Sequence, residues 1–512
     1  MPKMALKQLL SPWVDPTSLP DLVVESISNQ SQLIEEHALF LAYKNELCDR
    51  LDFVAEAIER GAVAIAMDAQ RNQCETLIAE YPEVVWIPVP HLAQEYGNIA
   101  AHFYGDPTKT MTVIGVTGTN GKSSTAYFIT QALNYLNKAC AFIGTIGIGL
   151  PDCLQESALT SLDPITFQQL AAQFREKGVN ALAIEMSSHA LDQNRLSGVH
   201  VDTIALTQVT SDHLDYHQTL EGYHAAKEKS MQLPGLNYAV LNLNDAEGYR
   251  WFETYHQQVD IIGYGTKVLA ADMIQALKYY LWIEAVCLDD AGLNIFLNDQ
   301  QESFVISVQL IGRFNVENIV ATVATLKAHG YSIKQIQAAV KAMHGAPGRM
   351  QLFGGDDFPA IYVDYAHTTD GLQKALQAVR EHSDRRLTVI FGCGGDRDKT
   401  KRAPMGAIAA QLSDHIIITS DNPRSEDPMQ IVKQIKQGII DEGFDLKNLT
   451  VECDRKKAIQ SAIMQASAND VLLIAGKGHE NTQKMDGYTI DCDDRAIVQA
   501  ALEQLKVKDD IV

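Results

Sequence analysis

Hydrophobic and polar positions follow two different periods along the first hundred residues. A helical pattern over 53–60 ends at Gly61, and the apolar run 62–67 that follows predicts a buried strand. A second apolar run at 84–89 predicts another strand. Strands that alternate with helices indicate a small α/β domain, and the stretch 104–108, which contains glycine and proline, predicts a linker after it.

The same alternation continues after the linker and indicates a parallel sheet covered by helices on both faces. A short apolar strand at 111–116 is followed by a glycine-rich turn and a helix at 124–136. The stretch 260–308 is rich in β-forming residues. Further strands are predicted at 181–184, 203–206 and 239–241, and two helices at 319–329 and 333–343.

A second doubly wound unit is predicted from about residue 345 onward. Its strands are expected at 360–363, 387–391, 416–419 and 471–474, and its helices at 372–381 and 429–440. We therefore expect an α/β fold of three domains. They are an N-terminal α/β domain at 1–107, a central doubly wound parallel sheet with a P-loop at 108–343, and a Rossmann-like domain at 344–512.

Composition and charge narrow the class of protein. The chain of 512 residues is 46% hydrophobic and 21% charged, which is ordinary for a globular protein. Its 42 Lys and Arg residues against 64 Asp and Glu give a net charge of −22, which argues against nucleic acid as a partner. No signal-peptide pattern, no apolar segment of about 20 residues and no Cys-x-x-Cys pair is present. We expect a cytoplasmic protein without membrane insertion.

The strongest chemical signal is the glycine-rich turn after the strand at 111–116. Glycines let backbone N–H groups approach phosphate oxygens, a lysine reaches the β and γ phosphates, and a serine hydroxyl can hold Mg²⁺. The spacing departs from the common P-loop, because the first glycine is Gly115 and not residue 116. The turn predicts that ATP and Mg²⁺ bind, with ATP contacts from Gly118, Thr119, Asn120, Gly121, Lys122, Ser123 and Ser124.

The segment 118–123, Gly-Thr-Asn-Gly-Lys-Ser, resembles the Mur ligase family, which also includes folylpolyglutamate synthetases. The resemblance implies an enzyme that phosphorylates a carboxylate with ATP and then forms an amide bond. It extends over most of the chain. It implies that the first domain binds a UDP-sugar peptide, the second ATP and the third the amine substrate.

The resemblance also implies a set of metal ligands. Glu185 follows the strand at 181–184, and a carboxylate at the carboxyl end of a parallel strand is well placed to bind Mg²⁺. His213 resembles the family's second ligand. Lys227 resembles its carbamylated lysine, although taken alone it would be a solvated helix lysine. The expected ligands are Ser123, Glu185, His213 and Lys227, and the expected catalytic residues are Lys122, Glu185, His213 and Lys227.

Other segments resemble substrate contacts of the family. Asn315 and Arg349 match ATP contacts, and in the segment 364–369 Thr369 stands where the family usually has proline. The family's Asp-Ser-Arg near the uridine site corresponds here to Gln30-Ser31-Gln32, and its Thr-Thr pair to Thr160-Ser161. The implied contacts to the UDP-sugar peptide are Ser31, Thr160, Ser161, Ser187, Gln193 and Arg195.

The segment 421–424, Asp-Asn-Pro-Arg, resembles the motif of family members that add meso-diaminopimelate. The far end of this substrate is an amino-acid centre. Its carboxylate favours a guanidinium, which Arg424 can supply with Arg397, and its ammonium favours a carboxylate, which Glu480 can supply. Lysine lacks the distal carboxylate. The implied diaminopimelate contacts are Arg397, Asp421, Asn422, Pro423, Arg424, Gly476 and Glu480.

The expected function is therefore an ATP-dependent ligase of peptidoglycan precursor synthesis. It would add meso-diaminopimelate to the D-glutamate γ-carboxylate of UDP-N-acetylmuramoyl-L-alanyl-D-glutamate through an acyl phosphate. Its expected partners are these small molecules, and we expect a monomer. The alternatives are a lysine-adding relative, a folylpolyglutamate synthetase and a P-loop ATPase without ligase chemistry. Segment 421–424 argues against the first two, and Lys227 with the amine site argues against the third.

Overall fold

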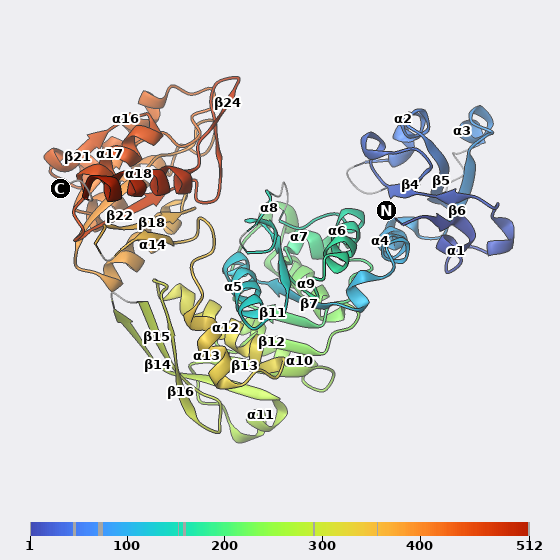
Figure 1. Ribbon diagram of the computed structural model, residues 1–512, viewed down its shortest axis with the longest axis horizontal. Helices are drawn as coiled ribbons and strands as arrows, with labels where there is room; N and C mark the ends of the chain where they lie inside the picture. The colour runs from blue at the N-terminus through green and yellow to red at the C-terminus, as the bar shows by residue number, and fades with distance from the viewer. Residues whose placement is uncertain are drawn as a thin grey trace. The chain divides into compact units, whose positions relative to one another are not determined.

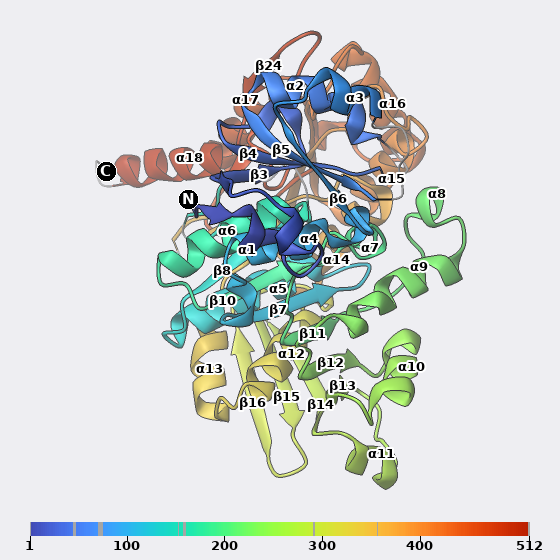
Figure 2. The same ribbon diagram turned by 90° about the vertical axis from the view of Figure 1, so that its right-hand side faces the viewer.

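The chain folds into alternating strands and helices (Figures 1 and 2). It divides into two compact units. A computed structural model describes residues 2–44, 48–69, 75–151, 153–156, 160–289, 292–355 and 357–509. The first unit comprises residues 1–122, 137–262 and 275–278, and the second comprises residues 123–136, 263–274 and 279–512. Within the described ranges, no helix is both long enough and apolar enough to span a bilayer.

The first unit contains a four-stranded parallel sheet near its N-terminal end. Its strands are β3 (Ser26–Ser28), β4 (Ala38–Ala42), β5 (Ala62–Asp68) and β6 (Val85–Val89), in that spatial order. Every residue of β4 is buried, since alternate side chains pack on opposite faces. Leu39 and Leu41 pack with α4 (Leu92–Phe103), whereas Phe40 and Ala42 pack with α2 (Val54–Glu59). The predicted α/β character of this region is confirmed.

A second parallel sheet of the first unit carries the glycine-rich turn. The neighbouring strands β12, β11, β7, β10 and β8 all run parallel, and β9 (Gly147–Gly149) pairs antiparallel with β8. Their bounds are Thr112–Thr117 for β7, Cys140–Gly144 for β8, Ala181–Glu185 for β10, Thr203–Leu206 for β11 and Tyr238–Asn242 for β12. The register pairs Glu185 with Val116, so the loops after β7 and β10 begin at the same edge.

The second unit contains an antiparallel meander and two helices before its parallel sheet. Strands β14 (Tyr279–Asp289), β15 (Gly292–Asn298) and β16 (Ser303–Val308) confirm the predicted β-rich region. Helices α12 (Phe314–Ala328) and α13 (Ile333–Lys341) correspond to the helices predicted at 319–329 and 333–343. A capping box between Ser332 and Gln335 fixes the start of α13.

The C-terminal sheet of the second unit has the strand order β17-β18-β22-β19-β20-β21. Strand β17 (Gln351–Gly354) is antiparallel to β18, and the other neighbours are parallel. Their bounds are Ala360–Asp364 for β18, Arg386–Phe391 for β19, His415–Ile418 for β20, Leu449–Val451 for β21 and Asp470–Ala475 for β22.

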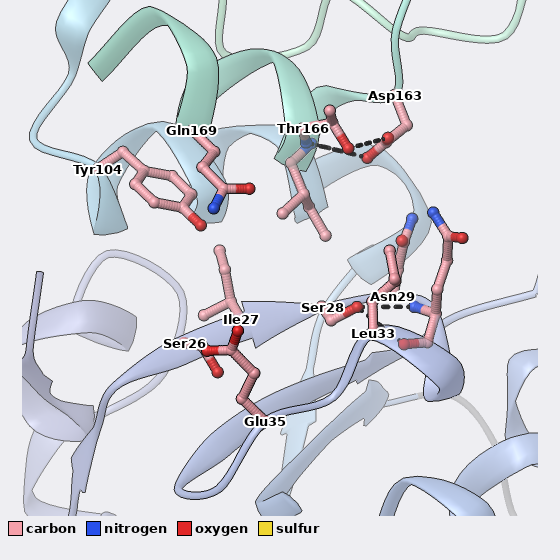
Figure 3. Close-up of a pocket in the computed structure, with 12 residues that line it drawn as sticks. Ser26, Ile27, Ser28, Asn29, Leu33, Glu35, Tyr104, Asp163, Thr166 and Gln169 are labelled. Carbon is pink, nitrogen blue, oxygen red and sulfur yellow. Dashed lines mark hydrogen bonds between the residues drawn. The ribbon is translucent and has the colours of Figure 1, made fainter. Parts of the chain in front are cut away.

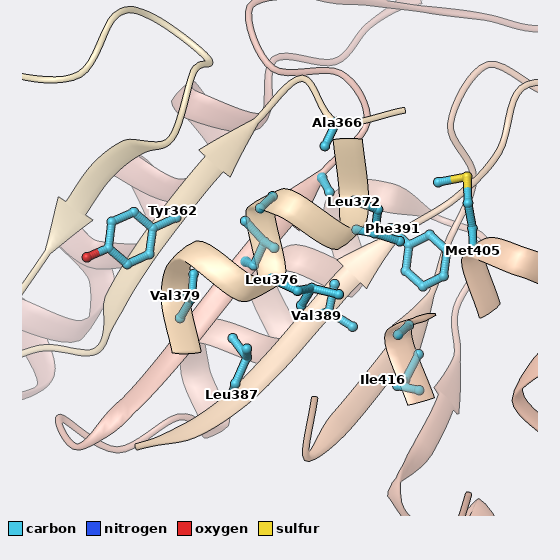
Figure 4. Close-up of a cluster of buried hydrophobic side chains, with 14 of the residues drawn as sticks. Tyr362, Ala366, Leu372, Leu376, Val379, Leu387, Val389, Phe391, Met405 and Ile416 are labelled. Carbon is cyan, nitrogen blue, oxygen red and sulfur yellow. The ribbon is translucent and has the colours of Figure 1, made fainter. Parts of the chain in front are cut away.

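Helices cover both faces of this sheet. One face packs against α14 (Thr369–His382), α15 (Arg402–Leu412) and α16 (Pro428–Asp441). Figure 4 shows side chains of α14 against Leu387 and Val389 of β19. The opposite face, with Ile390, packs against α17 (Arg455–Gln465) and α18 (Asp494–Asp509). The predicted α/β fold class with doubly wound parallel sheets is confirmed.

A fully buried ion pair joins α17 to α18. Both side chains, Arg455 and Asp494, are 0% exposed, and two nitrogens of the guanidinium each donate to a carboxylate oxygen at 2.7 Å. The same guanidinium donates to the carbonyl of Ser420 at 3.3 Å and to that of Ala475 at 3.0 Å. One arginine therefore ties the ends of two strands to the helices that cover them.

We predict that Asp494→Asn destabilises the second unit strongly, because it leaves the buried guanidinium without a counter-charge. The expected loss in free energy of unfolding is about 3–5 kcal/mol. The adjacent Asp493→Asn is the matched control, since Asp493 pairs with Arg495 and both side chains are 26% exposed. The control should cost less than about 1 kcal/mol. Urea unfolding of both full-length variants measures the difference, and equal losses would contradict a stabilising buried pair.

Candidate functional site

The glycine-rich turn between β7 and α5 (Lys122–Tyr135) has the backbone of a phosphate-binding loop. Gly118 and Gly121 have φ values of +142° and +85°, which favour glycine. A Cβ on Gly118 would lie 2.0 Å from Oγ1 of Thr207, so a side chain there would clash. Thr207 also donates to the carbonyl of Asn120 at 2.6 Å, and Thr119 N donates to Gln208 O at 2.6 Å. The loop after β11 therefore holds the turn in shape.

The predicted phosphate-binding side chains lie in and after this turn. Nζ of Lys122 donates to the carbonyls of Gly118 and Thr119 at 3.0 and 2.8 Å, which keeps its charge inside the loop. Ser123 and Ser124 lie in the first turn of α5 and are partly exposed. A helix start with a lysine and partly exposed serines is suited to anionic phosphate.

Lys227 is the most deeply buried of the predicted catalytic groups. It lies on α9 (Leu220–Glu228), is 1% exposed, and its Nζ donates to the carbonyl of Gly118 at 2.7 Å. Nζ also lies 4.6 Å from the ring centre of Tyr223. Burial and the nearby charge of Lys122 hold the pKa of Lys227 well below its usual value. A larger fraction of this lysine is therefore neutral than of a solvated one, and the neutral amine is the form that carbamylation needs.

Glu185 ends β10 as a buried carboxylate. Oε1 accepts from the backbone N–H of Thr145 at 2.7 Å, and Oε2 from its hydroxyl at 3.1 Å. His213 is more open, with its side chain 47% exposed and Nε2 3.3 Å from a carboxylate oxygen of Asp212. No cluster of three or more His, Cys, Asp or Glu side chains suited to a metal is found in the described parts of the chain. The predicted ligand set contains only two residues of those types.

Five of the predicted UDP-sugar-peptide contacts form one network around Glu185. The hydroxyl of Ser161 donates to the carbonyl of Glu185 at 3.1 Å and lies 3.2 Å from that of Ser187. Arg195 donates to the carbonyl of Ser161 at 3.2 Å and to Oε1 of Gln193 at 2.6 Å. The hydroxyl of Thr145, which donates to Glu185, also lies 3.0 Å from that of Thr160. The network thus gathers Thr160, Ser161, Ser187, Gln193 and Arg195.

The sixth predicted contact, Ser31, lies apart from this network. Its hydroxyl donates to Oε2 of Glu56 at 2.6 Å, and it does not line the neighbouring cavity of about 200 Å³. Figure 3 shows Ser26, Ser28 and Asn29 on one side of that cavity and Tyr104, Asp163, Thr166 and Gln169 on the other. The buried hydroxyl of Ser26 has no hydrogen-bond partner in the described residues. Ser26 and Ser28 thus line this cavity, although the sequence analysis did not identify them.

The two predicted ATP contacts outside the segment 118–124 have different environments. Asn315 is 4% exposed and binds the carbonyl of Ile311 and the amide of Asn318, which accepts from Thr125 on α5. Arg349 lies over the ring of Tyr365, with Cζ 4.6 Å from its centre. No described residue accepts a hydrogen bond from Nε of Arg349. Arg349 therefore keeps a donor available for an anionic ligand.

The predicted amine site forms where three loops meet at the carboxyl ends of β19, β20 and β22. Gly395 N donates to Asn422 O at 2.9 Å, and Asn422 Nδ2 donates to Oε2 of Glu480 at 3.1 Å. The close approach requires glycine, since a Cβ on Gly395 would lie 1.9 Å from Pro423 O, and one on Gly476 would lie 2.9 Å from Oδ2 of Asp421. All predicted amine-site residues lie on these loops, with Arg397 exposed on the first.

Arg424 has an unusual backbone conformation within this site. Its φ is +52°, a left-handed value that costs energy for a residue with a side chain and is frequent at functional sites. Its backbone N–H donates to Lys484 O at 3.0 Å, and Nη1 donates to Gly395 O at 2.6 Å and to Asn422 O at 3.5 Å. The guanidinium is therefore held beside Asn422.

Buried cations around the amine site were not identified from the sequence. Arg402 is 0% exposed and donates to both carboxylate oxygens of Glu426, at 3.0 and 3.1 Å, and to the carbonyl of Gly394 at 2.9 Å. Its hydrogen bonds lower the pKa of Glu426 to about 2. Lys477 is likewise 0% exposed. Lys477 stands in the Gly-Lys-Gly-His-Glu segment beside Glu480, which is the signal that could have indicated it.

Comparison with known proteins identifies the family. The model of the Mur ligase middle domain matches residues 116–326, and that of the Mur ligase, glutamate ligase domain matches residues 348–478. The UDP-N-acetylmuramoyl-L-alanyl-D-glutamate--2,6-diaminopimelate ligase of Coxiella burnetii is 40% identical over 90% of this chain and 92% of its own. The enzyme of the same name from Pseudomonas putida is 38% identical over 91% and 92%.

A solved structure agrees with these relatives. The structure of a UDP-N-acetylmuramoyl-L-alanyl-D-glutamate--2,6-diaminopimelate ligase superposes with a TM-score of 0.73 at 31% identity and covers 99% of this chain and 100% of its own. The family models match the segments that contain the P-loop and the amine-site loops through residue 478. This chain therefore belongs to the Mur ligase family of ATP-dependent, amide-bond-forming ligases.

Proposed function

We propose that this protein adds meso-diaminopimelate to the D-glutamate γ-carboxylate of UDP-N-acetylmuramoyl-L-alanyl-D-glutamate, with ATP as the energy source. This is a step of peptidoglycan precursor synthesis. The relatives that carry this activity in their names match nine-tenths or more of the chain. The observation that carries the choice of amine is the pairing of a guanidinium and a carboxylate around Asn422.

That pairing matches the far end of diaminopimelate. Nη1 of Arg424 lies 3.5 Å from Asn422 O, and Oε2 of Glu480 lies 3.1 Å from Asn422 Nδ2. An amino-acid centre carries a carboxylate and an ammonium on one carbon, so it complements a cation and an anion held by one residue. Lysine would leave the guanidinium unpaired, and glutamate would bring a like charge to Glu480. These mismatches disfavour a lysine-adding enzyme and a folylpolyglutamate synthetase.

The first half-reaction is phosphoryl transfer. Backbone N–H groups of the P-loop hold the phosphates of ATP, and Lys122 neutralises charge on the γ-phosphate. A γ-carboxylate oxygen of D-glutamate attacks the γ-phosphorus, and the bond to the bridging oxygen of ADP breaks. An acyl phosphate and ADP result. The Ser161, Ser187 and Arg195 network and the cavity beside Ser26 support binding of the UDP-sugar peptide in the first unit.

The second half-reaction forms the amide. A neutral amino group of diaminopimelate attacks the acyl carbon, the carbon–oxygen bond to phosphate breaks, and the amine loses a proton. Arg424 and Glu480 orient the substrate by its far end, so that one amino group is presented for attack. Positioning of this kind supplies much of the rate enhancement when several substrates must meet.

Mg²⁺ is the metal that this donor set fits, provided that Lys227 contributes an anion. Ser123, Glu185 and His213 offer oxygen and imidazole ligands, whereas an ammonium would repel the ion. The lowered pKa of Lys227 supports carbamylation, because the neutral amine attacks carbon dioxide and loses a proton as the N–C bond forms. When bound, Mg²⁺ would neutralise negative charge on the phosphates. The domain boundaries near residues 107 and 343, the monomeric state and the cytoplasmic location stay predictions.

Lys122→Ala tests the P-loop assignment. We expect ligation to fall by about a thousandfold or more, because the charge on the transferring phosphoryl group loses its counter-ion. Phosphate release with all three substrates present measures the loss, and circular dichroism confirms folding. Lys177→Ala, at an exposed lysine that follows α6 (Pro164–Glu176), is the matched control and should keep wild-type turnover. Near-normal turnover of a folded Lys122→Ala protein would contradict the assignment.

Lys227→Ala tests the carbamate. Activity should be lost, and a short carboxylic acid such as acetate in the buffer should restore part of it by supplying the missing anion. The same acid added to Lys122→Ala is the control and should restore nothing, since that variant lacks a cation. Rescue of both variants, or full activity of Lys227→Ala without acid, would remove Lys227 from the metal site.

Arg424→Ala tests the amine site. The variant should raise the KM for diaminopimelate by about ten- to a hundredfold, as expected for one charge-assisted hydrogen bond, and should change the KM for ATP little. The ratio of kcat/KM for diaminopimelate to that for L-lysine should shrink as well. Arg386→Ala, at the exposed start of β19, is the matched control. An unchanged ratio would place the amine site elsewhere.

A further inference from the structure

A lysine of the second unit is buried completely beside the amine site. Lys477 is 0% exposed, although lysine is almost never fully buried unless it is paired. It follows the carboxyl end of β22 and lies between Gly476 and Glu480, which belong to the proposed site. Such a residue needs a function that offsets the loss of hydration of its charge.

The ammonium of Lys477 meets three acceptors, one for each of its protons. Nζ donates to Thr482 O at 2.6 Å, to Oε2 of Glu480 at 2.9 Å and to Oδ1 of Asn422 at 3.4 Å. Thr482 begins β23 (Thr482–Lys484), whereas Asn422 belongs to the loop after β20. Lys477 thus connects the loop after β20 and the start of β23 to the carboxylate of Glu480.

Both hydrogen bonds to Glu480 from its neighbours end on the same oxygen. Lys477 Nζ and Asn422 Nδ2 donate to Oε2, at 2.9 and 3.1 Å. None of the described residues donates a hydrogen bond to Oε1, and the side chain of Glu480 is 35% exposed. The carboxylate is therefore anchored by one oxygen, and its other oxygen is available to a ligand.

We propose that Lys477 is a positioning residue for the amine substrate: it anchors Oε2 of Glu480 so that Oε1 receives the distal ammonium of diaminopimelate. The inference rests on the proposed function and adds a residue that selects the ammonium group. Lys477 does not touch the substrate in this arrangement. It acts through Glu480.

The charges around Glu480 agree with this role. Burial raises the pKa of Glu480, but the hydrogen bond and charge of Lys477, with the amide of Asn422, lower it below its usual value. Among the described residues, His479, whose pKa burial lowers to about 4, and Tyr365 also interact electrostatically with Glu480. His479 is therefore neutral near pH 7, and Lys477 is the cation hydrogen-bonded to Glu480. Lys477 keeps the carboxylate ionised for an incoming ammonium.

The test compares Lys477→Met with wild-type enzyme in complete ligation assays. Met has similar length but neither charge nor donors, so Glu480 loses an anchor and its pKa rises. We expect the KM for diaminopimelate to rise about tenfold at pH 7, with the KM for ATP nearly unchanged. The ionised carboxylate binds the ammonium, so activity is lost as pH falls through the pKa of Glu480. The acidic limb of kcat/KM for diaminopimelate should therefore move up by about one pH unit.

Two further variants keep the result interpretable. Lys477→Gln retains donors without charge, so it should recover part of the KM while the acidic limb stays shifted. It also replaces the Met variant if that protein does not fold. Lys447→Met, at an exposed lysine on the same unit, is the matched control and should match wild type in every parameter.

The outcomes separate the two proposals. A wild-type enzyme that does not ligate diaminopimelate overturns the proposed function. A wild-type enzyme that does so, together with folded Lys477 variants whose KM for diaminopimelate and acidic limb are unchanged, overturns only the role of Lys477. A lower KM in Lys477→Met would also overturn it, because Lys477 would then compete with the substrate for Glu480. Equal rises in the KM for ATP and for diaminopimelate would assign a purely structural role.

Discussion

Parallel strands leave their carboxyl ends at one edge of a sheet, and each part of the candidate site depends on this constraint. In the first unit, β7 leads into the P-loop, β10 ends in Glu185, and β11 leads to Thr207, which braces the P-loop. In the second unit, the loops after β19, β20 and β22 meet at Asn422. Residues far apart in the sequence thereby become neighbours without long connections, since crossover helices return the chain to the opposite edge.

Strand ends also present backbone carbonyls, and buried cations satisfy them. Lys227 binds the carbonyl of Gly118, Arg402 that of Gly394, and Lys477 that of Thr482. Arg455 binds the carbonyls of Ser420 and Ala475. Each of the four side chains is 1% exposed or less. A buried charge without partners costs folding free energy. Any loop movement that broke these hydrogen bonds would carry that cost, so the contacts stabilise the loop conformations. Loops fixed in this way would hold the proposed site residues in place before substrates bind.

Much of the fold could be predicted from apolar periodicity. The strands at 62–67, 181–184 and 387–391 were expected because buried parallel strands are continuous apolar runs, and they correspond to β5, β10 and β19. Short elements were missed, among them the hairpin of β23 and β24 (Thr489–Asp491), whose three-residue strands are too brief to show a period. That hairpin matters for the site, since Lys484 O accepts from Arg424 N.

The sequence predicted those parts of the candidate site that lie in a recognisable motif. It did not predict the residues that are near the site only because of how the chain packs. The P-loop and the Asp421–Arg424 segment have sequence signatures, and so could be assigned from the order of their residues. The burial of Arg402 and Arg455 has no such signature, because Lys and Arg in helical or loop segments usually face solvent. Ser31 was assigned by position within a divergent segment and stays a prediction. The neighbouring cavity is lined by Gln30 of that segment and by Ser26 and Ser28, which no motif marks.

The chain as a whole is negatively charged, whereas the loops of the candidate site contain cations. A net charge of −22 repels anions in general, yet the proposed substrates, ATP and a UDP-sugar peptide, are themselves anions. Binding must therefore come from cations concentrated at strand ends and not from the field of the whole protein. Lys122, Arg195 and Arg349 are the cations proposed for this role, and Arg424 and Glu480, both beside Asn422, are the charges proposed for a zwitterionic substrate. In the proposed function, recognition of the amine end depends on opposite charges placed close together, because salt screens interactions over short distances less than long-range ones.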